Sequence, residues 1–263
     1  MVVFISGVTS EIGSFICEKL LAKGHIIIGT YRNAVTTEFN EKICSRGGYL
    51  FKCDYLDKNM IDNVALQMKN TNLYWDVFIS AVGIISPIAA FEDSPIDKWE
   101  ENIYINSVSQ LRLLHGLLPF RNNICSTVFF MTSKGINDSF PNHMPYCLSK
   151  IMLVKACELL DDEIDNCKFV AFNPGFIQTK IINQEYENSN NVLDNRMSYD
   201  EKKEAFNRIW KFMNWVIKCE KSVVSGRNYM IKFDNWEDKD FKSFLQSNDD
   251  TYKLRRSRDS WND

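Results

Sequence analysis

The first twenty residues form one unit that constrains the fold more than any other stretch of the chain. Residues 2–6 are apolar and rich in β-branched side chains, as in a buried parallel strand. Gly7 and Gly13 bracket the turn that follows, and apolar residues then recur at helical spacing over 15–21. A strand, a glycine turn and a helix N-terminus in this order can bind phosphate, because backbone N–H groups and the helix dipole point at the anion. A plain strand-to-helix turn would use the same residues.

The same alternation of short apolar segments and helical patterns continues along the chain. Further strands are predicted at residues 25–30, 49–53, 76–83, 124–131, 168–172 and 227–231. Helical patterns lie between them, near residues 36–46, 58–69, 95–118, 140–161 and 206–216. Strands that alternate with helices are typical of an α/β fold with a parallel sheet.

The composition excludes several classes of protein. The chain has 263 residues, of which 45% are hydrophobic and 25% charged, as in an ordinary globular domain that buries a full core. A net charge of −3 gives no reason to expect nucleic acid or an anionic membrane as a partner. No apolar stretch approaches the ~18 residues of a membrane span, and the N-terminus lacks the basic region of a signal peptide.

Cysteine and histidine are distributed without a metal-binding pattern. The eight cysteines are scattered, with no C-x-x-C pair and no histidine at metal spacing. Free thiols in a reducing cytosol fit this distribution best, so we expect a cytoplasmic protein without a metal site. His25, His115 and His143 are isolated, and we expect structural or surface roles for them.

One segment near the middle of the chain has the clearest chemical potential. Tyr146 and Lys150 are four residues apart, so on a helix they share a face. A neighbouring cation favours the phenolate and would bring the Tyr146 pKa down from about 10. Ser133 follows the apolar segment that precedes this helix, close enough in the chain to hold a substrate oxygen. Tyr199 and Lys203 have the same spacing, so spacing alone does not identify the site.

Several predicted strands and helices carry residues that suit a dinucleotide. Arg32 follows the second strand, where an acid would accept from an adenosine ribose 2′-OH and an arginine would pair with a 2′-phosphate. No acid stands there, which favours NADP(H) over NAD(H), with a solvated surface cation as the alternative. Asp54, after the third strand, would accept from the adenine amino group or cap a helix. Gly83 ends the fourth strand, where backbone can approach a ligand, and the polar Asn106 lies inside the long helix that follows.

The last part of the chain is predicted to cover the substrate. Residues 173–179 leave the sixth strand at its carboxyl end, and residues 180–200 are rich in Asn and Glu. A segment of this kind beside an α/β sheet suggests a lid over the substrate, with a disordered insertion as the alternative. We expect residues 1–233 to form a single dinucleotide-binding and catalytic domain and residues 234–263 to be a C-terminal tail extension, either solvated or docked.

The order of these landmarks resembles the short-chain dehydrogenase/reductase family, in its compact single-domain branch, over about residues 1–232. The matching features are the glycine loop, Asp54, Gly83, Asn106, Ser133, Tyr146, Lys150, and the pair Pro174-Gly175 followed by Thr179. The resemblance implies a Rossmann-like, three-layer, doubly wound parallel sheet of about seven strands with helices on both faces.

The resemblance also implies an NADP(H)-dependent oxidoreductase that interconverts a carbonyl and a secondary alcohol of a small molecule. Tyr146 would exchange the proton, and Ser133 would orient the substrate oxygen. Lys150 would lower the Tyr146 pKa and hold the nicotinamide ribose, while Asn106 would position a water that passes protons from Lys150 to solvent. The cofactor-binding residues implied in this way are Gly7, Thr9, Ser10, Ile12, Gly13, Arg32, Asp54, Ala81, Gly83, Tyr146, Lys150, Pro174, Ile177 and Thr179.

Two departures from the family pattern keep alternatives open. Glu11 replaces the middle glycine of the loop and places a carboxylate near the pyrophosphate, and residues 80–83 lack both asparagines that the family has there. The alternatives are a non-catalytic cofactor-binding or regulatory protein and a sugar-modifying member of the family. Because the family commonly assembles through helices that correspond to residues 95–118 and 140–161, we expect a homodimer or homotetramer.

Overall fold

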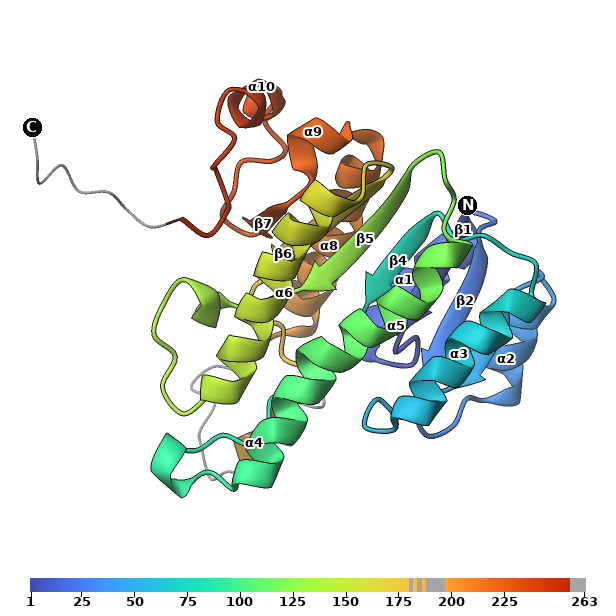
Figure 1. The fold of residues 1–263 in the computed structure, drawn as a ribbon, viewed down its shortest axis with the longest axis horizontal. Coiled ribbons are helices and arrows are strands. Elements are labelled where there is room, and N and C mark those ends of the chain that lie inside the picture. The colour runs from blue at the N-terminus through green and yellow to red at the C-terminus, as the bar shows by residue number, and fades with distance from the viewer. Residues whose placement is uncertain (180–181, 184–185, 188–196, 256–263) are drawn as a thin grey trace, which may run out of the picture.

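The computed structural model describes residues 1–255 apart from 180–181, 184–185 and 188–196 (Figure 1). Most of the segment predicted as a lid therefore lies outside the described residues, as does the last part of the predicted tail.

Seven strands form a single sheet in which every neighbouring pair is parallel. The strands are β1 (Val2–Ser6), β2 (Ile26–Tyr31), β3 (Tyr49–Lys52), β4 (Val77–Ser80), β5 (Ser126–Met131), β6 (Cys167–Asn173) and β7 (Arg227–Met230). Their order in the sheet is β3-β2-β1-β4-β5-β6-β7, so the direction in which strands are added reverses between β1 and β4. The predicted doubly wound parallel sheet is confirmed, and its switch point lies after β1 and β4, where such sheets bind ligands.

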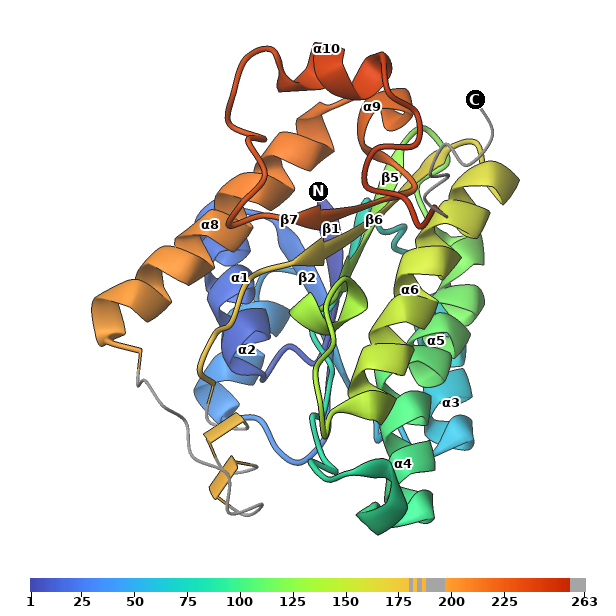
Figure 2. The same cartoon turned by 90° about the vertical axis from the view of Figure 1, so that its left-hand side faces the viewer.

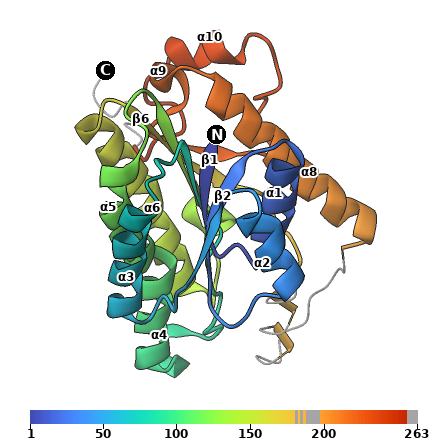
Figure 3. The same cartoon turned by 90° about the vertical axis from the view of Figure 1, so that its right-hand side faces the viewer.

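Helices cover both faces of the sheet and make three layers (Figures 2 and 3). One face carries α1 (Glu11–Ala22), α2 (Thr37–Cys44) and α8 (Tyr199–Lys218), and the other carries α3 (Lys58–Asn70), α4 (Ile96–Ile103), α5 (Ser109–Leu117) and α6 (Met144–Glu163). The helix predicted over 95–118 is interrupted by a π-helical turn at Tyr104–Val108. Within the described residues, no helix has the length and apolar character needed to cross a bilayer.

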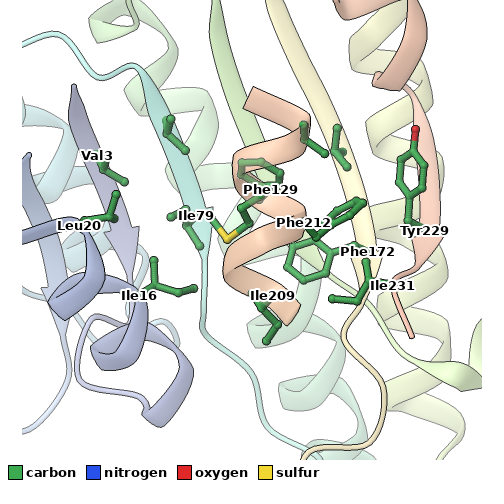
Figure 4. Packing of buried hydrophobic residues seen from close by; sticks show 14 of the residues in the cluster. Val3, Ile16, Leu20, Ile79, Phe129, Phe172, Ile209, Phe212, Tyr229 and Ile231 are labelled. Atoms are coloured by element: carbon green, nitrogen blue, oxygen red, sulfur yellow. The ribbon is translucent and has the colours of Figure 1, made fainter. Parts of the chain in front are cut away.

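Each face of the sheet has its own hydrophobic core, because successive side chains of a strand point to opposite faces. On β5, Phe129 packs in the cluster beneath α1 and α8, whereas Phe130 packs in the cluster beneath α3, α5 and α6. Figure 4 shows the first cluster, where Phe129 of β5 packs on Phe172 of β6, which in turn packs on Phe212 of α8. Full burial of one such aromatic side chain contributes roughly 1.5–3 kcal/mol, so these contacts hold α8 firmly on the sheet.

The chain after β7 is packed against the same core. It forms the short helix α10 (Phe241–Gln246), and another short helix, α9 (Lys221–Val224), precedes β7. The indole N–H of Trp236 donates to the Ile231 carbonyl at 2.9 Å, and Leu245 is fully buried. The guanidinium of Arg227 donates to the carbonyls of Leu245 and Asn248 at 3.0 and 3.1 Å. The described part of the predicted tail is therefore docked, while the division of the chain at residue 233 stays a prediction.

We predict that Leu245→Ala lowers the free energy of unfolding by about 2–5 kcal/mol, because it removes a buried side chain and leaves a cavity. Phe244→Ala is the matched control, since the neighbouring Phe244 side chain is 48% exposed, and its effect is expected to stay below ~1 kcal/mol. Urea denaturation of the full chain measures both. Equal losses, or none in either variant, would contradict a structural role for this part of the tail.

Candidate active site

The turn after β1 is pressed against the end of β4 at the switch point of the sheet. Gly7 has a φ of +70°, and a Cβ there would lie 2.9 Å from the Val82 side chain and 3.1 Å from the Ala81 carbonyl oxygen. A Cβ on Gly13 would collide with the carbonyl oxygen of Gly7. Only glycine fits at these two positions, so the turn is as tight as a phosphate-binding loop requires.

The start of α1 completes this loop. The hydroxyl of Ser10 caps the helix by accepting from the Gly13 N–H at 3.0 Å. The first turn of a helix leaves amide N–H groups without intrahelical partners, which favours an anion at this end. Thr9 is exposed and Ile12 is half-buried, both on the same loop.

The carboxylate of Glu11 forms an ion pair with the Nζ of Lys202 on α8, with both oxygens within 3.0 Å. The acid that replaces a glycine in this loop is therefore paired with a cation from a distant part of the chain.

The buried hydroxyls of Thr30 and Tyr55 support the glycine loop, and neither residue was predicted from the sequence to have this role. The Oγ1 of Thr30, in β2, accepts from the Gly7 N–H at 2.9 Å and lies 2.9 Å from the Tyr55 hydroxyl. Both side chains are buried. A threonine in a predicted strand carries no sign that it will meet a loop 23 residues earlier, so only the fold identifies this role.

Arg32 and Asp54 follow the carboxyl ends of β2 and β3. Arg32 is exposed. Asp54 is half-buried and accepts from the Leu56 N–H at 3.0 Å, while Asp57 is the residue that caps α3. The alternative interpretation of Asp54 as a helix cap is therefore wrong. Arg32 and Asp54 both stand on the edge of the sheet that carries the glycine loop.

The end of β4 is held by a glutamine in place of the asparagines that the family pattern would supply. The Ser80 hydroxyl donates to the Oε1 of Gln110. The Nε2 of Gln110 in turn donates to the carbonyls of Val82, at 3.1 Å, and Asn106, at 2.9 Å. All polar groups of this buried side chain are thus engaged, which keeps Ala81 and Gly83 in place despite the missing asparagines.

Asn106 lies in the π-helical turn and holds the chain after Gly83. Its Oδ1 accepts from the Ile84 N–H at 2.9 Å, and its Nδ2 donates to the Ile84 carbonyl at 2.8 Å and to Asn102 Oδ1 at 2.7 Å. π-Helical turns are often found at functional sites. Both donors of the Asn106 amide are used, so Oδ1 is the side-chain atom left with capacity for a water.

Gly83, Asn106, Lys150 and Tyr146 come together around the start of α6. A Cβ on Gly83 would lie 3.1 Å from Asn106 Oδ1 and 3.8 Å from Lys150 Nζ. The Lys150 side chain is buried, and its Nζ lies 5.4 Å from the centroid of the Tyr146 ring. The competing pair at Tyr199 and Lys203 starts with a side chain that is 79% exposed, so burial separates the two pairs.

The pKa values of this pair differ from the sequence-based expectation. Burial raises the pKa of Tyr146 to about 12, and nearby Cys147 and Tyr186 add to the rise. Burial lowers the pKa of Lys150 to about 8. The Tyr146 pKa was expected to lie below its ordinary value, and it lies above it because burial of the phenol is the largest influence; that Lys150 lowers this pKa stays a prediction.

Ser133 follows β5 and has a buried hydroxyl oxygen that, among the described residues, has no hydrogen-bond partner. The short 3₁₀ turn after it, Lys134–Ile136, packs on the first turn of α6, where a Cβ on Gly135 would collide with the sulfur of Cys147. The Ser133 loop is thus fixed against the helix that carries Tyr146. A buried hydroxyl without a partner is costly unless a ligand satisfies it.

His143 and Tyr186 stand beside this site, although sequence reasoning gave His143 only a structural or surface role. His143 Nδ1 lies 2.7 Å from the Pro141 carbonyl, so this nitrogen carries the proton, and Nε2 accepts from the Tyr186 hydroxyl at 3.4 Å. Its ring stacks on Phe140 with centroids 3.8 Å apart. An isolated histidine in a sequence gives no signal of such a contact.

The chain after β6 carries the remaining predicted residues. Gly175 has a φ of +85°, which turns the chain at the carboxyl edge of the sheet. Pro174 and Ile177 are buried and Thr179 is half-buried. These residues lie at the carboxyl edge of the sheet, and their role in binding stays a prediction.

Burial of Lys150 gives a prediction of pH-dependent stability. Below pH 8 the folded protein must enclose an ammonium that the unfolded chain exposes, so Lys150→Met is expected to stabilise the protein by about 1–3 kcal/mol at pH 7. Between pH 8 and the ordinary pKa of 10.5, the folded wild-type protein binds fewer protons than its unfolded chain, so its free energy of unfolding rises with pH. The difference in stability between wild type and Lys150→Met therefore shrinks over this range. Urea unfolding at pH 7 and 10 measures it, with the more exposed Lys155→Met as control. A Lys150 variant less stable at pH 7 would contradict the cost of burial.

Comparison with known proteins places these features in a family. The family model described as short chain dehydrogenase matches residues 1–190. An uncharacterized oxidoreductase of Saccharomyces cerevisiae is 24% identical over 181 residues, which cover 68% of this chain and 71% of the relative. An uncharacterized oxidoreductase of Schizosaccharomyces pombe is 27% identical over 104 residues, 40% of this chain and 42% of that protein.

Solved structures share the fold at low sequence identity. The crystal structure of the Saccharomyces cerevisiae short chain dehydrogenase/reductase superposes with a TM-score of 0.74 at 19% identity, covering 91% of this chain and 98% of the other. A short chain dehydrogenase of Shigella flexneri complexed with NADP gives a TM-score of 0.74 at 17% identity, covering 88% and 96%. The family model, which spans most of the chain, together with the fold and the order of the site residues, shows that this chain belongs to the short-chain dehydrogenase/reductase family of oxidoreductases.

Proposed function

We propose that this protein is an NADP(H)-dependent oxidoreductase that interconverts a carbonyl and a secondary alcohol of a small molecule. The observation that carries the proposal is the buried Ser133 hydroxyl, which has no hydrogen-bond partner in the described part of the chain and lies on a loop fixed against the helix of Tyr146 and Lys150. A substrate oxygen would satisfy this hydroxyl and bring the reacting carbon to the same place.

The residues at the switch point fit a dinucleotide. The close approach of Gly7 and Gly13 and the capped start of α1 offer backbone N–H groups to a pyrophosphate. Gly83 leaves room for a ligand in front of Lys150. Lys150 would hold the nicotinamide ribose, and Pro174, Ile177 and Thr179 would line the nicotinamide end.

Tyr146 would serve as the acid and base of the reaction. A phenol whose pKa is raised to about 12 is neutral near pH 7, which is the form that gives a proton to a carbonyl oxygen during reduction. Lys150, with a pKa of about 8, changes its protonation near working pH and would stabilise the phenolate that remains. Ser133 would donate to the same substrate oxygen. The cofactor, when bound, would supply or accept the hydride.

The proton path to solvent would start at Lys150. Asn106 Oδ1 and Lys150 Nζ both lie next to Gly83, and a water between these two groups would connect the lysine to the exterior. The two donors of the Asn106 amide are fixed by Ile84 and Asn102, so the acceptor would point to such a water in a defined direction.

The features that favoured a non-catalytic protein have local explanations. Glu11 is paired with Lys202, and Gln110 holds the end of β4 by donating to the Val82 carbonyl. Neither departure therefore requires loss of cofactor binding, and we favour the enzyme over the regulatory alternative. Nothing in the described residues selects a sugar over other carbonyl compounds.

We also propose a cytoplasmic homodimer or homotetramer. Leu148, Met152 and Leu159 are apolar, between 39% and 49% exposed, and spaced along one face of α6, as expected of a helix that packs against a second copy. All eight cysteines are free, which fits a reducing compartment. A monomeric mass in sedimentation equilibrium at micromolar concentration would exclude the assembly.

We predict that Tyr146→Phe lowers turnover by about 10²- to 10⁴-fold, because the proton donor is lost while the ring remains. The Kd for NADPH, measured by fluorescence titration, is expected to change little. Tyr199→Phe, on the exposed pair with the same spacing, is the control and is expected to keep full activity. Turnover by the Tyr146 variant at the wild-type rate would refute its assignment as acid and base.

We predict that Arg32→Ala weakens NADPH binding by about 10- to 100-fold, since one charge-assisted contact to the 2′-phosphate is lost. NADH affinity should stay nearly constant, because NADH has no phosphate at that position. Titration of both nucleotides separates the effects, and Arg208→Ala, in an exposed ion pair with Glu204, controls for net charge. Equal losses for both nucleotides would remove the basis for the NADP(H) preference.

A further inference from the structure

The glycine loop of this protein contains a carboxylate, Glu11, where an anionic ligand would bind. The residue occupies the first position of α1, between the cap at Ser10 and the close-packed Gly13. A carboxylate there would repel a pyrophosphate and would offset the favourable dipole of the helix. This negative charge must be compensated if the loop is to bind a pyrophosphate.

Lys202 supplies a positive charge that compensates it. Its Nζ lies 2.9 and 3.0 Å from the two carboxylate oxygens of Glu11, although the residues are 191 positions apart. About a quarter of each side chain is exposed, so the pair lies at the edge of the loop and not inside the core. Ion pairs of this exposure contribute little to the free energy of unfolding. Their main effect is therefore on the electrostatic potential at the glycine loop.

The packing of α1 and α8 fixes this encounter. Phe15 of α1 packs on Phe206 of α8 with ring centroids 5.2 Å apart. One turn or more further along both helices, the Nζ of Lys23 lies 5.8 Å from the ring of Trp210. Residue numbers rise together on the two helices, so the helices run in the same direction with their N-termini side by side. Figure 2 shows α1 and α8 on the same face of the sheet.

The start of α8 is itself well defined. Ser198 and Glu201 form a reciprocal capping box, with the Ser198 N–H donating to Glu201 at 2.8 Å and the Glu201 N–H donating to Ser198 at 3.2 Å. Lys202 therefore stands in the first turn of a helix that two hydrogen bonds hold in place. The packing of α8 on α1 therefore places the Lys202 ammonium beside the glycine loop.

We propose that Lys202 is a positioning residue of the cofactor site, which neutralises Glu11 and thereby lets this glycine loop accept the pyrophosphate of NADP(H). The inference rests on the proposed function, because it concerns the same nucleotide. It adds a residue of α8 to the cofactor site and makes the nucleotide loop depend on an ion pair between two helices.

Four variants of the full chain test the inference by NADPH binding, measured by isothermal titration calorimetry. Lys202→Met keeps most of the apolar stem and removes the charge, and we expect it to raise the Kd about tenfold. Lys202→Arg should bind like wild type. Glu11→Gln alone should bind as tightly as wild type or a few-fold tighter. Glu11→Gln combined with Lys202→Met should return the Kd to near the wild-type value, because the repulsive charge is gone.

Lys211→Met is the matched control, since Lys211 lies on the same helix in an exposed pair with Glu237, and it should leave the Kd unchanged. Thermal unfolding of each variant shows whether the fold is retained. Wild-type affinity in Lys202→Met, or a double variant as weak as that single variant, would overturn the inference while the proposed function stands. Failure of the unmodified chain to bind NADPH would overturn both.

Discussion

The parallel arrangement of all seven strands is the constraint on which the site depends. Parallel strands present their carboxyl ends at one edge of the sheet, so turns that are far apart in the sequence become neighbours. Gly7 meets the backbone at Ala81 in this way, and a larger side chain at residue 7 would press on the end of β4. Ser133 and the chain after Asn173 reach the same edge on β5 and β6.

Much of this arrangement could be predicted from the sequence. Apolar strand segments, glycine turns and the Tyr146–Lys150 spacing are local patterns. They predicted the α/β class with a parallel sheet, the longer helices and the residues around α6, while the doubly wound order followed from the family resemblance. The predicted strand at residues 2–6 coincides with β1. Local patterns succeed here because each strand and helix is decided by residues within one short window.

The parts that were not predicted depend on contacts between distant residues. Gln110 supports the end of β4 across 28 residues, and Lys202 meets Glu11 across 191. The link between His143 and Tyr186 is equally invisible in a single sequence. The pKa of Tyr146 was misjudged for a related reason, since the sequence identifies the neighbouring lysine but not the extent to which both groups lose solvent. Desolvation is a property of the whole fold.

The docking of the chain after β7 has a consequence for how the protein reaches its native state. β1 lies inside the sheet, yet the core beneath α8 is completed by Trp236 and Leu245, which follow all seven strands in the chain. In a nascent chain, apolar surface of the early strands therefore stays exposed until Trp236 and Leu245 leave the ribosome. Such a chain needs protection from aggregation during synthesis, and a stop codon that removed α10 would harm the yield of folded enzyme before it affected any residue of the site.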